Sequence, residues 1–195
     1  MLLACIDRSL SNGKVSLAPL HKLLQRGRGA KLNVVELGCG CGIVGLGVSK
    51  LLPKAQVYLT DLDEAREVVE HNIHDNVSPD ENRVQFEKLE WGLEPPSSIE
   101  RESFDLILIA DCIYNADSAP LLVGTLEKLT RTSPKAVIVM ATKVRHSSEA
   151  IFFDLMSQAK ILQAGHTVMP LPNGEEADVA GAAEHVDIYI FLAAS

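Results

Sequence analysis

The chain has 195 residues, of which 47% are hydrophobic and 23% charged, and its net charge at pH 7 is −8. This composition excludes a largely disordered chain, and the length suits one domain, over residues 1–195, with a sizeable core. The acidic balance argues against nucleic acid as a partner, because a phosphate backbone would be repelled unless a basic patch compensated. We therefore expect a globular protein with a basic or neutral partner.

The sequence offers no targeting or disulfide pattern. Its four cysteines are too few and too irregularly spaced for a disulfide framework, which favours a reducing compartment. The opening MLLACIDRSL reaches Asp7 and Arg8 too early for a signal peptide, and no stretch approaches the roughly 18 apolar residues of a membrane span. We expect a cytoplasmic location, with the nucleus as a second option, and no membrane partner.

The predicted elements alternate along the chain. Residues 1–32 are predicted to be a leading helical segment and residues 33–195 a core of seven strands. The strands are runs rich in Val, Ile, Leu and aromatic residues, at residues 33–37, 56–60, 83–87, 104–110, 136–142, 164–170 and 186–192. Apolar residues at helical spacing predict helices at about residues 44–52, 63–76, 118–129 and 148–156.

This alternation predicts the fold class. Strands with near-continuous apolar residues, separated by helices, indicate a parallel sheet that is covered on both faces. The last two strands are separated by LPNGEEADVAGAAEH, which has no helical stripe, so they should be antiparallel to each other. The predicted fold is α/β, a Rossmann-like doubly wound sheet of seven mostly parallel strands with an antiparallel C-terminal hairpin.

A glycine-rich stretch, VVELGCGCGIVG at residues 34–45, follows the first predicted strand and opens a helix. In that context backbone N–H groups and a helix N-terminus come close to a bound nucleotide. Residues 40–45 match the dinucleotide pattern G-x-G-x-x-G, so a nicotinamide or flavin dinucleotide is one interpretation. The strand ends at Leu37, however, and counting from Gly38 puts Ile43 where the last glycine of that pattern should stand.

Two acidic residues narrow the choice of cofactor. Asp61, about 20 residues after the loop, can accept both hydrogen bonds of a ribose diol, as either cofactor class requires. Glu36, beside the loop, would repel a pyrophosphate but can hold a cationic amino-acid group, directly or through water. S-adenosylmethionine carries such a group and no phosphate, so the sequence favours S-adenosylmethionine over a dinucleotide.

The loop and three later motifs resemble a known family. The stretch ELGCGCG at residues 36–42 resembles the first motif of the class I, seven-strand methyltransferases that use S-adenosylmethionine. TDL at residues 60–62, LEWG at 89–92 and ADCIY at 110–114 are similar to the successive motifs of the family 16 protein-lysine methyltransferases. The resemblance covers about residues 33–130 well and the rest loosely.

The resemblance implies a set of cofactor-binding residues at the carboxyl ends of the strands. Within this set Asp61 would take the ribose hydroxyls and Trp91 would lie against the adenine. The full set is Glu36, Gly38, Cys39, Gly40, Asp61, Leu62, Trp91 and Ala110.

Two further residues are candidates for the chemistry. Asp111, at the end of the fourth strand, is placed to orient an incoming ammonium group, and Tyr114 could add a ring wall or a cation–π contact. The expected reaction is methyl transfer to a nitrogen, in the first place a lysine of a protein; translation factors and chaperones are typical substrates of the family. Alternatives are another nitrogen of His, Arg or a small amine such as nicotinamide, a non-catalytic cofactor-binding subunit, and an NAD-dependent dehydrogenase.

Other features fit less well. Family members usually carry a tryptophan before the glycine loop, whereas Trp91 is the only tryptophan here, which puts cofactor closure in doubt. The pair Cys39 and Cys41 could hold a metal only with two further ligands, and the sequence offers no convincing ones, so we expect no metal. Three histidines, at positions 146, 166 and 185, lie near strand ends and could reach the cleft.

Overall fold

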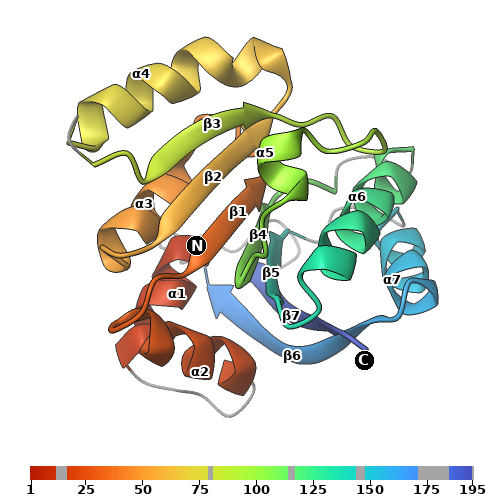
Figure 1. The fold of residues 1–195 in the computed structure, drawn as a ribbon. Helices are drawn as coiled ribbons and strands as arrows, with labels where there is room; N and C mark the ends of the chain where they lie inside the picture. The colour runs from red at the N-terminus through yellow and green to blue at the C-terminus, as the bar shows by residue number, and fades with distance from the viewer. Residues whose placement is uncertain (12–16, 79–80, 114–116, 144–147, 171–184, 195) are drawn as a thin grey trace, which may run out of the picture.

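The structure is a computed structural model that describes residues 1–11, 17–78, 81–113, 117–143, 148–170 and 185–194 (Figure 1). The helices are α1 (Leu2–Ser11), α2 (Ala18–Gly27), α3 (Ile43–Leu51), the 3-10 helix η2 (Asp63–Ala65), α4 (Arg66–Asn76), α5 (Ser97–Glu100), α6 (Ser118–Thr132) and α7 (Ser148–Gln158). The strands are β1 (Asn33–Leu37), β2 (Gln56–Asp61), β3 (Val84–Lys88), β4 (Leu106–Ala110), β5 (Val137–Thr142), β6 (Ile161–Pro170) and β7 (His185–Ala193). None of the described helices is long and apolar enough to cross a membrane.

The strands form one sheet of seven in the order β3-β2-β1-β4-β5-β7-β6. The pairs from β3 to β5 are all parallel, and β7 runs antiparallel to both of its neighbours, β5 and β6. The predicted fold is thereby confirmed, including the antiparallel hairpin at the C-terminal end. Strands β2 and β3 follow β1 on one side, and β4 and β5 follow on the other side. The strand order therefore reverses at β1, and the gap between β1 and β4 is the topological switch point where such sheets bind ligands.

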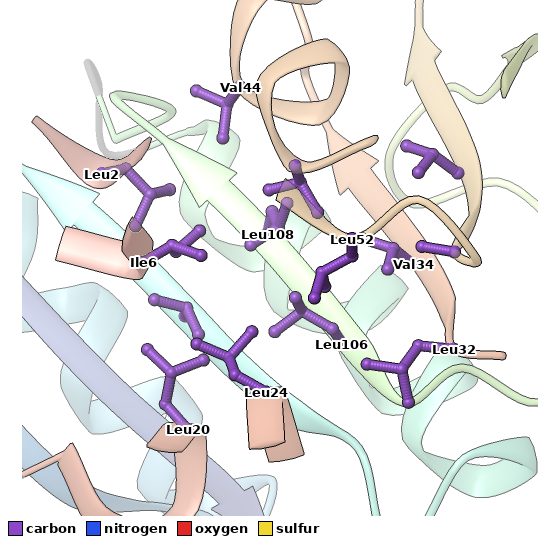
Figure 2. Close-up of a cluster of buried hydrophobic side chains, with 14 of the residues drawn as sticks. Leu2, Ile6, Leu20, Leu24, Leu32, Val34, Val44, Leu52, Leu106 and Leu108 are labelled. Carbon is purple, nitrogen blue, oxygen red and sulfur yellow. The ribbon is translucent and has the colours of Figure 1, made fainter. Parts of the chain in front are cut away.

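Helices cover both faces of the sheet, as Figure 1 shows. On one face α1, α2, α3 and α4 bury apolar side chains against the strands, and on the other face α5, α6 and α7 do so. Figure 2 shows the first of these cores, a single cluster that contains Leu2 of α1, Leu20 and Leu24 of α2, and Leu106 and Leu108 of β4. Burying one such side chain contributes about 1.5–3 kcal/mol, so these two layers hold the sheet in place.

The amino-terminal edge of the sheet is tied by polar contacts. The Asp105 carboxylate, just before β4, accepts a hydrogen bond from the backbone N–H of Asn33 at 2.9 Å and pairs with Arg26 of α2. The Asn33 side chain donates to Glu102 at 3.1 Å. These contacts close the amino edge and leave the carboxyl ends of the strands as the edge where a ligand can enter.

The elements differ from the prediction mainly at their ends. The leading segment forms two helices, and the one-turn helix α5 was not predicted because four residues carry no period. Strand β6 starts at Ile161, three residues before the predicted start at residue 164. The reason is Lys160, which takes a left-handed conformation (φ 57°) and reverses the chain directly after α7. Sequence rules assign that conformation to glycine or asparagine, so a lysine there gives no signal.

Candidate functional site

A cavity of about 360 Å³ opens at the carboxyl ends of β1, β2, β3 and β4. This is a size typical of small-molecule sites, which range over about 300–1,000 Å³. Its position is the one that the switch point between β1 and β4 predicts. The lining residues are Gly38, Gly40, Asp61, Leu62, Leu89, Glu90, Trp91, Ala110, Asp111, Cys112, Ser118 and Leu121.

The glycine loop forms one wall of this cavity. Gly38, Gly40 and Gly42 all have positive φ angles, of 64°, 56° and 79°, which L-residues with side chains rarely adopt. At Gly38 space is also limiting, because an added Cβ would lie 2.9 Å from the Trp91 ring and 2.9 Å from the Cys112 sulfur. The loop therefore needs glycine at position 38 for both its backbone conformation and its close contact with the opposite wall.

Asp61, the last residue of β2, is fixed by this loop. One of its carboxylate oxygens accepts a hydrogen bond from the N–H of Gly40 at 2.8 Å, and the other accepts one from the N–H of Leu62, also at 2.8 Å. These two bonds hold the carboxylate at the cavity wall. Each oxygen has a second lone pair, so the carboxylate can still accept two hydrogen bonds from a vicinal diol.

Glu36 and Cys39 do not line the cavity, although the resemblance places both among the cofactor-binding residues. The Glu36 side chain is 1% exposed and points under the loop, where its carboxyl oxygen accepts the N–H of Gly45 in the first turn of α3 at 2.7 Å. The Cys39 side chain is buried in the core below the loop. Glu36 is buried as part of β1, and Cys39 lies between the two cavity-lining glycines with its side chain turned to the core.

Burial changes the ionisation of both residues. Removal from water raises the pKa of Glu36 from 4.5 to about 8; the hydrogen bond from Gly45 opposes this rise and the charge of Asp61 adds to it. Burial likewise raises the pKa of the Cys39 thiol, with Glu36 and Asp61 adding to the effect. At neutral pH Glu36 is therefore largely a neutral carboxylic acid, and Cys39 is not a thiolate.

The wall opposite the loop is apolar. Trp91, half-buried, lies in the second hydrophobic core and reaches the cavity together with Leu89 and with Leu121 of α6. The turn after Trp91 is fixed by a hydrogen bond from the N–H of Gly92 to the hydroxyl of Thr125, at 3.0 Å. Leu62, 45% exposed, completes the rim. This wall can hold a flat apolar group such as a nucleobase.

The end of β4 supplies the remaining wall. Ala110 and Asp111 both line the cavity, and the Asp111 N–H donates to the carbonyl of Ala141 on β5 at 2.9 Å. Asp111 has a left-handed backbone conformation (φ 55°), which is uncommon for a residue other than glycine, although aspartate adopts it more readily than most. Such conformations cluster at functional sites. The second catalytic candidate, Tyr114, lies outside the described residues.

Five lining residues were not among the predicted ones. Leu89 and Glu90 belong to the motif LEWG, so their inclusion in that motif was a signal that could have found them. Cys112 lines the cavity with a buried thiol, and burial raises its pKa to about 12. Ser118 and Leu121 come from the start of α6 and lie in no motif, so only the packing of α6 brings them to the cavity.

The charge and the hydrogen bonding of the cavity fit a cation better than a phosphate. Asp61, Glu90 and Asp111 line it, and no described lining residue is basic. Three of the loop N–H groups are already used, since those of Cys39, Gly40 and Gly42 donate to protein oxygens. These features favour a sulfonium compound with an ammonium group and a ribose over a dinucleotide. No cluster that could hold a metal is found in the described ranges.

The comparisons with known proteins agree with this geometry. The sequence pattern of one family, described as lysine methyltransferase, matches residues 9–159. The chain belongs to the lysine methyltransferase family. The match covers all of the cavity-lining residues.

Individual relatives share over a third of the aligned residues. The chain is 38% identical over 133 residues to EEF1A lysine methyltransferase 3 of Mus musculus, covering 67% of this chain and 53% of that one. It is 38% identical over 125 residues to protein N-lysine methyltransferase METTL21A of Xenopus tropicalis, covering 64% and 55%. The chain thus spans about half the length of these curated relatives.

Solved structures show the same fold at low sequence identity. Magnesium protoporphyrin IX methyltransferase of Synechocystis with bound SAM has a TM-score of 0.63 at 12% identity, covering 98% of this chain and 79% of that chain. An O-methyltransferase family protein of Burkholderia thailandensis has a TM-score of 0.65 at 14% identity, covering 98% and 56%. At these identities the likeness concerns the fold alone.

Proposed function

We propose that this protein is an S-adenosylmethionine-dependent N-methyltransferase that methylates a lysine side chain of a protein. Family membership supports this activity. The observation that carries it is the cavity itself, in which loop N–H groups hold the Asp61 carboxylate and no described basic side chain is present for a phosphate. S-adenosylmethionine is the cofactor that the family indicates, and it fits these walls.

The binding residues divide by chemistry. Asp61 would accept the ribose hydroxyls, Trp91 and Leu89 would contact the adenine, and Gly38 would leave room for the backbone to approach the cofactor. Glu36 would make no direct contact with the cofactor, because its side chain is buried under the loop. Its role is to hold the first turn of α3 against β1 through Gly45.

When bound, S-adenosylmethionine supplies a methyl group on a sulfonium, which an amine attacks in line. The protein has to align the amine with the methyl group and exclude water. This alignment lowers much of the activation barrier of such a displacement. A lysine arrives as an ammonium, since its pKa is about 10.4, and has to release one proton to solvent water before its nitrogen lone pair can attack the methyl group. The exposed carboxylate of Asp111, at the end of β4, would hold this ammonium beside the cavity.

We propose a translation factor as the protein substrate. This proposal rests on the relatives, two of which are called EEF1A lysine methyltransferase 3, from mouse and from Xenopus tropicalis.

We also propose a cytoplasmic location, which the four cysteines support, since all four are free thiols.

Calorimetry tests the cofactor. We expect S-adenosylmethionine and S-adenosylhomocysteine to bind, NAD to give no response, and Asp61→Ala to weaken binding of both cofactor forms at least tenfold. Tight binding of NAD alone would overturn the assignment.

A labelling experiment tests the reaction. The protein is incubated with tritiated S-adenosylmethionine and recombinant EEF1A or a cell extract, and the labelled amino acid is identified after hydrolysis. We expect methyl-lysine from the wild-type protein and a loss of at least tenfold in Asp111→Asn. The matched control is Asp117→Asn, an exposed acid at the start of α6 outside the cavity lining. Label on histidine or arginine would point to a different acceptor, and cofactor binding without any label would indicate a non-catalytic subunit.

A further inference from the structure

The cavity uses only half of the carboxyl edge of the sheet. It lies over β3, β2, β1 and β4, and the same edge continues across β5, β7 and β6. The ladders pair Ala110 with Ala141, Thr142 with Asp187, and Val168 with Asp187. Because neighbouring strands are about 4.8 Å apart, Asp187 lies roughly 10 Å from the end of β4 along this edge.

A cluster of polar side chains lies on this second half. Asp187, at the start of β7, is 6% exposed, and one of its oxygens lies 2.6 Å from Nε2 of His166 on β6. Its other oxygen lies 3.5 Å from Nε2 of His185. A buried carboxylate is costly unless it is paired, so Asp187 depends on these imidazoles.

The imidazole of His166 is held in one orientation. Its ring stacks on the ring of Tyr189 with the centroids 4.5 Å apart and an angle of 20° between the planes. Nε2 faces Asp187 and donates its proton to the carboxylate. Nδ1 has no hydrogen-bond partner among the described residues, and the side chain is 36% exposed. Nδ1 is therefore an oriented hydrogen-bonding atom, an acceptor in the neutral ring and a donor in the charged ring.

We propose that His166, held by Asp187, binds the main chain of the protein segment that carries the acceptor lysine. This inference rests on the proposed function. An extended segment whose lysine enters the cavity beside Asp111 has to cross β5, β7 and β6, since the cofactor covers the other side. The Nδ1 atom of His166 would form a hydrogen bond with a peptide group of that segment. His166 is in this sense a positioning residue for the substrate and has no contact with the cofactor.

Two variants of His166 separate this role from a structural one. His166→Phe keeps a ring to stack on Tyr189 and removes both nitrogens, and His166→Asn keeps an acceptor close to the position of Nδ1. The matched control is His71→Phe, because His71 on α4 also lies near a carboxylate, that of Asp75 at 3.4 Å, but on an exposed helix outside the edge. The acceptor pool is the protein of a eukaryotic cell extract freed of small molecules, with saturating tritiated S-adenosylmethionine.

We expect His166→Phe to raise the apparent KM for the protein pool about three- to tenfold, the effect of one or two lost hydrogen bonds. The kcat and the calorimetric affinity for S-adenosylhomocysteine should stay within twofold, and His166→Asn should recover most of the loss. The variant His71→Phe should behave as the wild-type protein.

The outcomes are distinguishable. If the wild-type protein labels lysine and His166→Phe has the same KM, the inference is wrong and the proposed function stands. The inference is also wrong if His166→Phe lowers cofactor affinity and melting temperature along with KM, and His166→Asn does not restore them, since the pair is then structural. If the wild-type protein binds the cofactor but labels no lysine, the proposed function fails and the inference falls with it.

Discussion

At the scale of single residues, the cavity depends on glycines that cannot be replaced by a residue with a side chain. Gly38 meets two constraints at once, a φ of 64° and a distance of 2.9 Å from its would-be Cβ to the Trp91 ring. Gly40 meets only the first, with a φ of 56° and nothing within 4 Å of an added Cβ. Substitutions at the two glycines therefore distinguish the cost of backbone strain from the cost of steric contact in the same loop.

We predict that Gly38→Ala weakens cofactor binding more than Gly40→Ala does. Both substitutions place a side chain in the left-handed region, at a cost of about 1–2 kcal/mol. Only the methyl group at position 38 also pushes against Trp91 and Cys112, which adds about 1–3 kcal/mol of overpacking. Calorimetry with S-adenosylhomocysteine measures the loss of cofactor affinity, and urea unfolding measures the loss of stability. Equal losses in the two variants would contradict a tight contact at Gly38.

The buried acid Glu36 gives a pH dependence. Its pKa is about 8 in the folded chain, compared with an ordinary value of 4.5, so between these values the folded chain holds a proton that the unfolded chain has released. Stability from this group is present below pH 4.5 and is lost as the pH rises through about 8. In this window the loss is on the order of 1.4 kcal/mol per pH unit.

We predict that Glu36→Gln removes this loss. The amide oxygen can still accept the N–H of Gly45, and the amide does not ionise. The melting temperature of the variant should match that of the wild-type protein near pH 5 and exceed it increasingly toward pH 8. Differential scanning calorimetry across this range measures the difference, with the exposed acid Glu67 changed to Gln as the control. Melting curves that stay parallel at every pH would show that Glu36 is ionised in the folded chain.

At the scale of elements, the glycine loop depends on how closely α3 lies on the sheet. A Cβ added at Gly45 in α3 would lie 2.2 Å from the Leu59 side chain of β2 and 2.9 Å from the Glu36 carboxyl. By contrast, Gly124 in α6 has nothing within 4 Å of an added Cβ. The same substitution therefore has opposite consequences in the two helices.

We predict that Gly45→Ala destabilises the protein and Gly124→Ala stabilises it. Alanine in a helix interior is favoured over glycine by about 0.8–1.0 kcal/mol, which Gly124→Ala should gain. In Gly45→Ala the overpacking costs about 1–3 kcal/mol and moves α3 away from β1 and β2, so cofactor affinity should also fall. Urea unfolding of both variants is the measurement, and a stabilised Gly45→Ala would mean that α3 moves outward freely.

Elements with long apolar runs could be predicted from the sequence, and those set by tertiary packing could not. The strand at residues 33–37 was predicted with its observed bounds, Asn33–Leu37, because Gly38 follows it directly and marks its end. For the site, Asp61 and Trp91 line the cavity, but the depth of Glu36 was not foreseeable. A sequence shows that Glu36 belongs to a strand end, while only the turn of the loop decides that it lies under α3.

At the scale of the whole molecule, charge is the property that bears on the substrate. The net charge is −8, and three carboxylates face the cavity with no described basic residue in its lining. A protein with such a field attracts a basic segment over distances of about one Debye length, 10 Å at 0.1 M salt. The field of the whole chain and the charges at the cavity therefore act in the same direction, toward a lysine with basic neighbours.

We predict that added salt slows methylation of basic substrates selectively. Two peptides with one central lysine, one with arginine neighbours and one with serine neighbours, are compared at about 20 mM and about 200 mM salt. The kcat/KM of the arginine peptide should fall several-fold, since the shorter screening length removes long-range attraction, while kcat changes little. The serine peptide serves as the control and should respond weakly. A similar response of both peptides would mean that the acidic field plays no part in substrate choice, and that recognition depends on the short-range contacts at Asp111 and along β5, β7 and β6.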